Sequence, residues 1–400
     1  MKEFTINFYR TGHPGDESFG TVELPATWNE LQDAKEKARI TDNYVAYSVE
    51  VSEINRDCLT DQIPEKVNPL ELNLLAQRLD KMSKQESGIF KGMVTIEARQ
   101  RKGEPIPLPQ LINLTHNTDN CHVAHGVHND KALGKWLYEN DMLPDAEYEK
   151  ATFKTWESAY ADEYFALLGR KHRETENGTF SPVGYIEIES IDEVYKAGQS
   201  MFVERFDSPV ILEMSKGFFN DPVYDNDLTA TMYLPASIRD INAAIDKVGA
   251  ASIKECAYHC ADCVIPQVKE MIDDTENLDY VNQFAEALAG LEGRTQNTVY
   301  KAVWETVKPP DLESAAALVS EIDQYNLNSN MGCPEDYAKE YLDRLKPDAG
   351  IAEYINLYPL GKELMQRDNT VQTSYGFLTR KDGEPISQTS QNSGPTMQMG

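Results

Sequence analysis

Three of the six cysteines lie close together in the segment ECAYHCADC, at residues 255–263. Cys256, Cys260 and Cys263 have the C-x3-C-x2-C spacing by which radical enzymes that use S-adenosylmethionine bind an iron–sulfur cluster. Together with His259, the same thiols could instead bind another metal ion. The competing interpretation is that the thiols are small apolar side chains packed in a core.

A second group of metal-ligating side chains lies in the segment HNTDNCHVAHGVH. One thiol and four imidazoles make up this group: Cys121, His116, His122, His125 and His128. Thiolates and imidazoles bind zinc, so a zinc site is one interpretation. The segment is polar and precedes a helix expected to begin near Asp130, which favours a loop with solvent-facing histidines. The chain contains no Walker A, H-E-x-x-H or G-x-S-x-G motif, so we expect no enzyme and no cofactor.

An internal repeat organises the chain. ELPATWNELQDAKEK at 23–37 returns about 210 residues later as YLPASIRDINAAIDK at 233–247. NPLELNLLAQRLDKM at 68–82 then resembles NLDYVNQFAEALAGL at 277–291. Two further matches follow in the same order: FKGMV from Phe90 with YKAVW from Tyr300, and LGRKHRETENGTFSPVGYIEI from Leu168 with LGKELMQRDNTVQTSYGFLTR from Leu360. These matches predict a tandem duplication whose first copy has about 18 extra residues, because the final offset is only about 192.

Each copy carries the start signal of a capped helix. Thr27 with Glu30, and Ser237 with Asp240, have the spacing by which an N-cap hydroxyl and an acidic side chain satisfy the free amides of a first turn. The apolar spacing that follows predicts one buried helix face in each copy, formed by Trp28, Leu31 and Ala34 and by Ile238, Ile241 and Ala244.

The first copy offers a test of the cysteine cluster. VAYSVEV, which begins at Val45, aligns with CAYHCAD, which begins at Cys256, and its alternation is typical of a β-strand. A strand would direct Cys260 and Cys263 to opposite faces, whereas cluster ligands must converge on one centre. This pattern favours thiols that pack in a core, and the metal or iron–sulfur protein remains the weaker alternative.

The repeat predicts an α+β fold built from small modules. Before each capped helix stands an alternating strand, FTINFYR or PVILEM, and each copy ends in a hairpin-like segment. In the first copy, the predicted N-terminal α/β, central helical and C-terminal α+β modules span 1–64, 65–110 and 111–190. A linker at 191–207 follows, and the same three modules of the second copy span 208–275, 276–308 and 309–380. Residues 381–400 are predicted to be a disordered tail.

The charge balance is strongly acidic. The chain has 66 acidic and 38 basic residues, a net charge of −28. Such a chain repels nucleic acid and anionic membranes and attracts basic surfaces. The sequence shows no run of 18 apolar residues and no signal-peptide pattern, so we expect a cytoplasmic protein.

Carboxylates are the remaining candidates for a binding site. Several groups crowd loops or helix starts, where a solvated helix face is the simpler interpretation of any one group. The candidates are Asp141, Asp145, Glu147, Glu149, Glu157, Asp162 and Glu163 in the first copy, and Asp221, Asp225, Asp227, Asp273, Asp274, Glu276, Asp279, Glu335, Asp336, Glu340 and Asp343 in the second.

Each copy resembles the ArdA antirestriction family of acidic DNA mimics. The resemblance is carried by LPATWNELQDAKEKARITDNYVAYSVEV, NPLELNLLAQRL and LGRKHRETENGTFSPVGYIEI, and by LPASIRDINAAIDK, NLDYVNQFAEAL and INLYPLGKELMQRDNTVQTSYGFLTR. It implies an elongated chain of small α/β and α-helical modules, present here as two tandem copies. It also implies binding to the DNA groove of the methyltransferase core of type I restriction–modification enzymes.

The resemblance makes an antirestriction DNA mimic the first hypothesis for function, with a duplicated monomer acting as a pseudo-dimer or with a homodimer as the assembly. The alternative is an acidic interaction protein of the same fold that inhibits another basic DNA-binding or defence protein. The low-ranked alternative is a metal or iron–sulfur protein that uses Cys256, Cys260 and Cys263.

Overall fold

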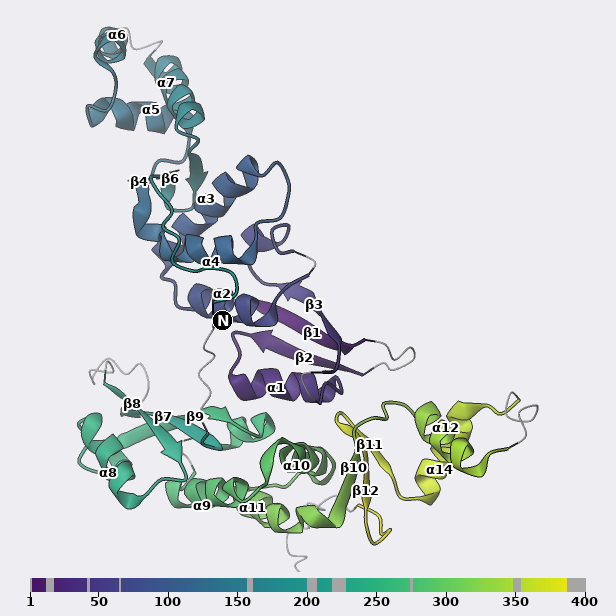
Figure 1. Ribbon diagram of the computed structural model, residues 1–400. Helices are drawn as coiled ribbons and strands as arrows, with labels where there is room; N and C mark the ends of the chain where they lie inside the picture. Colours follow the sequence, from purple (N-terminus) through teal and green to yellow (C-terminus); the bar gives the residue numbers. More distant parts are fainter. Residues whose placement is uncertain are drawn as a thin grey trace, which may run out of the picture. The chain divides into compact units, whose positions relative to one another are not determined.

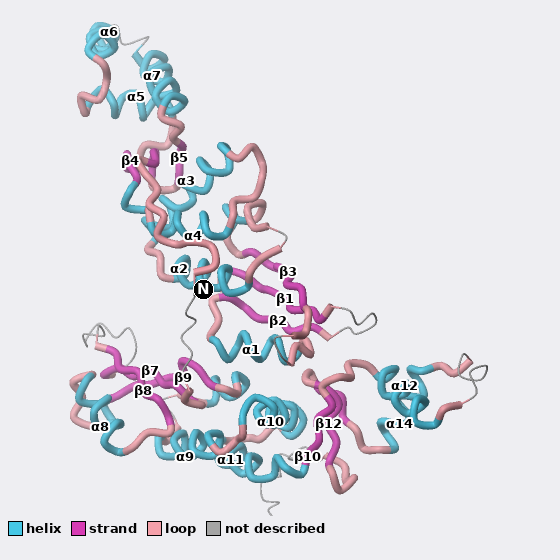
Figure 2. Tube along the Cα trace, in the orientation of Figure 1, coloured by secondary structure: helices cyan, strands magenta, loops and turns pink. Residues whose placement is uncertain are grey.

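The structure is a computed structural model (Figure 1), and it describes residues 2–11, 18–41, 44–64, 66–156, 161–199, 207–217, 228–273, 276–347 and 354–386. Contacts divide the chain into two compact units. Unit 1 comprises Met1–Ile6, Glu23–Ala26 and Val49–Val203, and unit 2 comprises Asn7–Val22, Thr27–Ser48 and Glu204–Gly400. Helices and strands both occur along the described chain (Figure 2), so the fold is mixed α+β, as the sequence predicts.

The strands in the described residues form three-stranded sheets with the orders β2-β1-β3, β4-β6-β5, β8-β7-β9 and β10-β12-β11. Their bounds are β1 Phe4–Arg10, β2 Phe19–Leu24, β3 Tyr47–Ile54, β4 Cys121–His125, β5 Thr179–Ser181, β6 Gly184–Ile188, β7 Val210–Lys216, β8 Thr229–Leu234, β9 Cys256–Cys263, β10 Tyr325–Asn328, β11 Val371–Thr373 and β12 Gly376–Arg380. The two predicted alternating strands, FTINFYR and PVILEM, are confirmed as β1 and most of β7. Their alternate apolar side chains are buried, as the period of two requires.

Helices cover these sheets and connect them. The α-helices are α1 Trp28–Lys37, α2 Pro69–Asp80, α3 Lys84–Gln100, α4 Leu108–His116, α5 Asp130–Glu139, α6 Asp145–Trp156, α7 Ala161–Thr175, α8 Ile238–Lys247, α9 Leu278–Ala289, α10 Gly293–Val307, α11 Leu312–Glu321, α12 Pro334–Leu345 and α14 Leu357–Arg367. Short 3-10 helices are η1 Asp57–Leu59, η2 Thr118–Asn120, η3 Ile253–Glu255, η4 Pro266–Met271 and η5 Ile322–Gln324. No helix among the described residues is both long and apolar enough to cross a membrane.

Both predicted helix caps are present. Thr27 and Ser237 accept hydrogen bonds from the N3 backbone amides of α1 and α8, and Glu30 and Asp240 reach back to the cap amides. The predicted apolar face of α1 is confirmed at Leu31, which is buried. The corresponding prediction for α8 is wrong at its first position: Ile238 is 79% exposed, because α8 contacts its own sheet only through later residues.

The N-terminal and C-terminal halves share an unusual clamp between strand and helix. The amide of Asn73 on α2 accepts from the backbone N–H of Ala26 and donates to its carbonyl, at 2.8 and 2.9 Å. Asn282 on α9 makes the same pair of bonds with Ala236. Each bonded alanine follows a proline with a cis peptide bond, Leu24–Pro25 or Leu234–Pro235.

The two sheets that end each half also share one register. Ala124 pairs with Tyr185 between β4 and β6, and Asn328 pairs with Phe377 between β10 and β12. Gly184 and Gly376 open the last strands with φ of 141° and 139°, where an added Cβ would lie 2.2 or 2.3 Å from the carbonyl oxygen of the paired strand. Only glycine fits this position. The duplication itself stays a prediction, and these matched elements support it.

The cysteine strand corrects two expectations. Thr11 N–H bonds to Ala46 O, and Gly217 N–H bonds to Glu255 O, so Ala46 corresponds to Glu255 and the sequence alignment of Val45 with Cys256 is shifted by two residues. A two-residue shift keeps every side chain on its face, which is why alternation could not reveal it.

Cys260 and Cys263 do not lie on opposite faces as predicted. The pairing of β7 with β9 shifts between Ile211 and Leu212, so β9 has one extra residue, a β-bulge, at Ala261. The bulge brings both thiols into one hydrophobic core. The physical reason for the error is that alternation of period two assumes an unbroken ladder.

The histidine segment is also more regular than expected. Cys121–His125 form β4, which pairs with β6, instead of a polar loop. The helix predicted near Asp130 is confirmed as α5, and Asn129 caps it. A proline-containing loop at 101–107 joins the end of α3 at Gln100 to the start of α4 at Leu108. Of the predicted tail, residues 387–400 lie outside the described residues.

Candidate functional site

The predicted acidic residues have different environments. Nine are exposed: Asp141, Asp145, Glu149, Asp162, Glu163, Asp273, Asp279, Glu340 and Asp343. Four are partly buried: Glu147, Glu276, Glu335 and Asp336. The remaining five, Glu157, Asp221, Asp225, Asp227 and Asp274, lie outside the described residues.

Some of these carboxylates are neutralised by a neighbouring base. Asp162 pairs with Lys131 at 2.5 Å, and Glu147 pairs with Lys171. Asp336 accepts hydrogen bonds from Gly332 N–H and Lys339 at the start of α12. Burial raises the pKa of Asp336, but these bonds and one from Cys333 outweigh it and lower the pKa below the ordinary value. Asp336 therefore stabilises its own helix terminus, and the predicted clusters around α6, α7 and α12 are partly structural.

The helix pair α9 and α11, which pack against one another (Figure 1), carries carboxylates and no base. Residues 276–293 and 309–324 contain no lysine, arginine or histidine. We call the exposed carboxylates of these two stretches the acidic ridge: Asp279, Glu286, Glu292, Asp311, Glu313, Glu321 and Asp323. Because no base lies within the ridge stretches, like charges add there and raise the local negative potential.

Only Asp279 of the acidic ridge was among the predicted residues. Clusters of acids drew attention to α6, α7 and α12, where bases are interspersed on the same helices. The useful signal was the absence of bases over two stretches that the fold brings together. Asp311 also caps α11: its carboxylate accepts from Ser314 N–H at 2.7 Å, and bonds from Ser314 lower its pKa.

The corresponding helix pair of the N-terminal half, α2 and α4, is different. Arg78 lies on α2 and bonds to Thr115 of α4, and α4 itself has no acidic residue. Residues 192–195 cross α4, where Asn113 bonds to the backbone of Val194 and Tyr195 and Asn117 bonds to that of Asp192. The described part of the predicted linker is thus held on this surface.

The two asparagines of α4 are replaced by other residue types in the C-terminal half. Since β4 and β10 have the same register, Asn113 and Asn117 correspond to Ala317 and Glu321 on and at the end of α11. Neither replacement offers an amide that can both donate and accept. The C-terminal half therefore lacks the side chains that hold a crossing segment on α4 and carries a carboxylate in place of one of them.

The metal-binding hypotheses gain no geometric support. Among the described residues, no group of three or more His, Cys, Asp or Glu side chains could hold a metal ion. Cys260 and Cys263 are buried, and burial raises the pKa of the Cys263 thiol well above its ordinary value. His259 is exposed beside Glu213 at 3.6 Å. In the other group, His122 is partly buried and His116, His125 and His128 are exposed.

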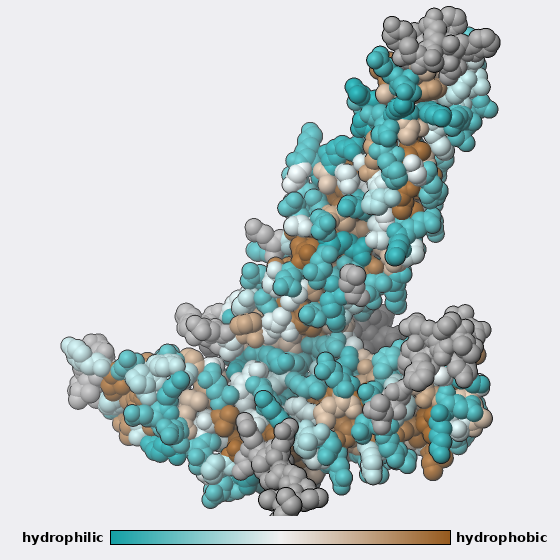
Figure 3. All heavy atoms as spheres, turned by 180° about the vertical axis from the view of Figure 1, so that it is seen from behind, coloured by the Kyte–Doolittle hydropathy of each residue, from teal (hydrophilic) through white to brown (hydrophobic). Residues whose placement is uncertain are grey.

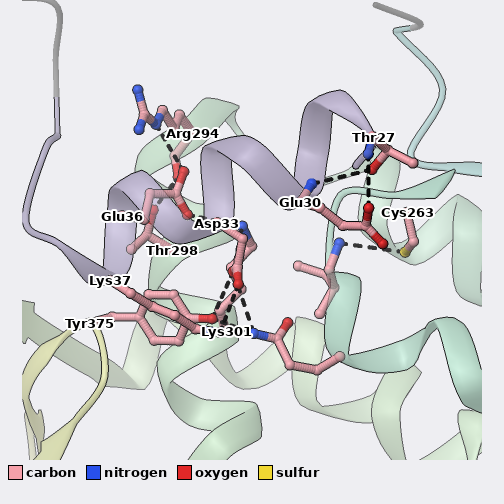
Figure 4. Close-up of polar contacts among 12 residues, drawn as sticks. Thr27, Glu30, Asp33, Glu36, Lys37, Cys263, Arg294, Thr298, Lys301 and Tyr375 are labelled. Atoms are coloured by element: carbon pink, nitrogen blue, oxygen red, sulfur yellow. Dashed lines mark hydrogen bonds and ion pairs between the residues drawn. The ribbon is translucent and has the colours of Figure 1, made fainter. Parts of the chain in front are cut away.

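A second polar cluster was not predicted at all. Within unit 2, α1 packs on β9 and η4 and forms ion pairs with α10, and two of its carboxylates are buried (Figure 4). Lys301 on α10 is 2% exposed and lies 3.1 Å from Asp33 and 2.9 Å from Glu36. Arg294 donates to Glu36 at 2.8 Å, and Lys37 lies 2.8 Å from Asp33.

Neutral partners complete this ion network. The Tyr375 hydroxyl donates to Asp33 at 2.7 Å, and the Gln267 amide donates to both Asp33 and Tyr375. Burial raises the pKa of Asp33, but the charges of Lys301 and Lys37 and the bond from Tyr375 outweigh it, so the pKa lies below its ordinary value. Buried ions with every partner in place are stable, whereas removal of one partner leaves an uncompensated charge.

The first turn of α1 makes a matching set of contacts. Thr27 and Asn29 donate to the two carboxylate oxygens of Asp262 at 2.7 and 2.9 Å, and Lys269 pairs with Glu30 at 2.7 Å. Burial raises the pKa of Asp262, although the bonds from Thr27 and Asn29 act against it. These contacts make the network a structural contact of α1 with β9, η4 and α10.

Neither a protein-family model nor a curated protein matches this chain.

Proposed function

We propose that this protein is an antirestriction protein, an acidic DNA mimic that occupies the DNA-binding groove of type I restriction–modification enzymes. The acidic ridge is the observation that carries the proposal: an exposed helix pair that bears carboxylates and no base. The resemblance of both halves to the ArdA family supplies the identity of the target. The protein acts by occupying the groove, without turnover.

The electrostatics are consistent with this role. If every one of the 38 basic residues were paired with an acid, 28 carboxylates would still remain, since 66 − 38 = 28. Duplex DNA presents one charge per about 1.7 Å of axis, and a groove that binds it is lined with cations. Fixed carboxylates would bind such a groove by summed attraction, which salt weakens. The face in Figure 3 is mostly hydrophilic.

The direct test is a titration of type I restriction and modification activity. DNA cleavage and DNA methylation are measured with increasing amounts of the protein at two salt concentrations. We expect inhibition of cleavage that weakens at high salt, and no binding of the protein to DNA itself. Absence of inhibition would disprove the proposal, and capture of a different basic DNA-binding or defence protein from host lysate would then favour the alternative target.

A matched pair of variants tests whether the ridge carries the effect. The ridge variant combines Asp279→Asn, Glu286→Gln, Glu313→Gln and Glu321→Gln. The control combines Glu139→Gln, Asp162→Asn, Glu193→Gln and Glu340→Gln, four exposed acids that each lie beside a lysine or arginine. Net charge changes equally in both. We expect the ridge variant to weaken inhibition about tenfold or more and the control to weaken it much less, because paired acids contribute less to the field.

A single ridge substitution should have only a small effect. If one carboxylate alone abolished inhibition, the interface would depend on a hot spot and not on summed charge.

A further inference from the structure

Two capped helices with the same local structure have different surroundings. α1 is docked through Asp33 and Glu36, which are 5% and 3% exposed. The corresponding residues of α8 are Ala243 and Asp246, and both are exposed. The correspondence follows from the two capping boxes, which place Thr27 and Ser237 at the same helical position.

The surface that binds α1 also has a counterpart. We call its residues the α1-binding surface: Asp262, Gln267, Lys269, Arg294, Lys301 and Tyr375. Backbone bonds align the segment of Asp262, Gln267 and Lys269, because Asn55 N–H bonds to Glu3 O as Val264 N–H bonds to Pro209 O. The match of FKGMV with YKAVW aligns the helices of Arg294 and Lys301, and the matched Gly184 and Gly376 align the hairpin of Tyr375. The corresponding residues of the N-terminal half, which we call the N-half surface, are Glu53, Cys58, Thr60, Lys84, Lys91 and Val183.

The N-half surface lies within unit 1 and is open. Lys84, Lys91 and Glu53 are exposed, whereas Lys301 at the position of Lys91 is buried under α1. A depression of about 310 Å³ is lined by Cys58, Lys91 and their neighbours. One half thus has a covered surface, and the other half has the same surface uncovered.

The charges of α8 suit the N-half surface. Asp246 of α8 corresponds to Glu36 of α1, which pairs with Lys301 and Arg294. On the N-half surface, Asp246 would face the corresponding Lys91 and Lys84. Arg239 stands where Asn29 does, and it would face Glu53 in place of Asp262. Opposite charges would therefore meet at both ends of the helix.

The residues at the centre of the contact are polar in the docked pair, whereas their counterparts on α8 and on the N-half surface are apolar. In the docked contact, Asp33 bonds to Gln267 and Tyr375. The counterparts are Ala243 on α8, and Cys58 and Val183 on the N-half surface. A polar set of three has become an apolar set of three, so no buried polar group would be left without a partner.

We propose that α8 of one molecule docks on the N-half surface of a second molecule, in the way that α1 docks on the α1-binding surface. The contact is heterologous: each molecule uses α8 to bind one neighbour and the N-half surface to bind another. Such contacts produce head-to-tail chains, or rings where the rotation closes. Docking is weaker than that of α1, since Ala243 and Thr60 cannot form the ion pairs made by Asp33 and Lys269. The assembly is therefore reversible and depends on concentration.

The first test is the mass of the full-length protein in solution as a function of concentration, by sedimentation velocity. We expect the mass to rise with concentration. Asp246→Lys should shift this rise to at least about tenfold higher concentration, because it places a cation against Lys84 and Lys91. Asp279→Lys, an equal charge change on the acidic ridge, is the control and should not. A monomer at every concentration, or equal behaviour of the two variants, overturns the proposal.

A mixing experiment tests the head-to-tail geometry. Asp246→Lys impairs the helix of one molecule, and Glu53→Lys impairs the surface of another by placing a cation against Arg239. The two altered sites repel each other, because both then carry only cations at the contact. At a concentration where the wild-type protein associates, each variant alone should remain monomeric, but an equimolar mixture should form a one-to-one complex through the intact helix of one and the intact surface of the other. Failure of the mixture to associate, when the wild-type protein does, rules out a heterologous contact.

A cross-link distinguishes a second molecule from the same chain. Ala243→Cys would lie beside Cys58, so oxidation with copper phenanthroline should join the two thiols and produce covalent oligomers. Cys58→Ser in the same background should abolish them. A cross-linked species of monomer mass would show that α8 docks within its own chain and would overturn the proposal. None of these outcomes depends on inhibition of restriction, so the two proposals can fail separately.

Discussion

α1 and α8 begin with the same cap and have the same length, yet only α1 is docked through buried ions. Lys301 and Lys91 make the comparison sharp: they occupy the same position on α10 and α3, one 2% exposed and the other exposed to solvent. The role of a charged residue therefore depends on what packs over it.

The largest effect is expected from Lys301→Met compared with Lys91→Met. Removal of Lys301 leaves Asp33 and Glu36 buried without their shared cation, which should lower the free energy of unfolding by about 3–5 kcal/mol. Lys91→Met removes an exposed charge and should change it by no more than about 0.5 kcal/mol. Urea denaturation of the two variants, monitored by tryptophan fluorescence at low protein concentration, measures both. Equal effects would show that the ion network does not stabilise the docked helix.

An intermediate effect is expected from the caps. Ser237→Ala removes a cap and should cost about 1 kcal/mol. Thr27→Ala removes a cap and also the hydroxyl that donates to Asp262, so it should cost about 2–3 kcal/mol. Thr27→Ser keeps the hydroxyl and should recover most of the loss. The same denaturation assay applies, and a Thr27→Ala cost no larger than that of Ser237→Ala would mean that the bond to Asp262 contributes nothing.

The smallest effect is expected from acidification, because two carboxylates act in opposite directions. The pKa of Asp33 is lowered, so its contribution to stability is present above the ordinary value of about 4 and is lost as the pH falls through the lower folded-state value. The pKa of Asp262 is raised, so its proton uptake favours the folded state, and that contribution is lost as the pH rises through the raised value.

The two titrations together predict a shallow optimum for α1 in mild acid and a loss of protection below pH of about 4. Hydrogen exchange of the α1 amides measures it, with the α8 amides as an internal control. Loss of protection in both helices at the same pH would attribute the effect to global unfolding.

Local features of this fold could be predicted from the sequence. The caps of α1 and α8, the alternation of β1 and β7 and the start of α5 depend on residues within a few positions of each other. The bulge in β9 could not be predicted, since it arises from pairing with β7 and not from the strand's own residues. The exposure of Ile238 could not be predicted either, because apolar spacing identifies a helix face but not what covers it.

The sequence predicted that the candidate site is acidic, but it did not predict which residues form the site. The acidic excess is a property of composition, whereas the acidic ridge exists because α9 and α11 pack together and both lack bases. Clusters of acids near α6, α7 and α12 were more conspicuous in the sequence, but some of their members are paired with nearby bases or cap a helix.

Residue types and their spacing are enough to predict the secondary structure at the caps and strands and the sign of the net charge, since short-range hydrogen bonds and composition suffice for both. Which carboxylates are buried and which are exposed depends instead on packing between distant parts of the chain. Glu36 and Lys301 are separated by 265 residues, and a buried ion pair forms only where the fold removes water from both partners at once.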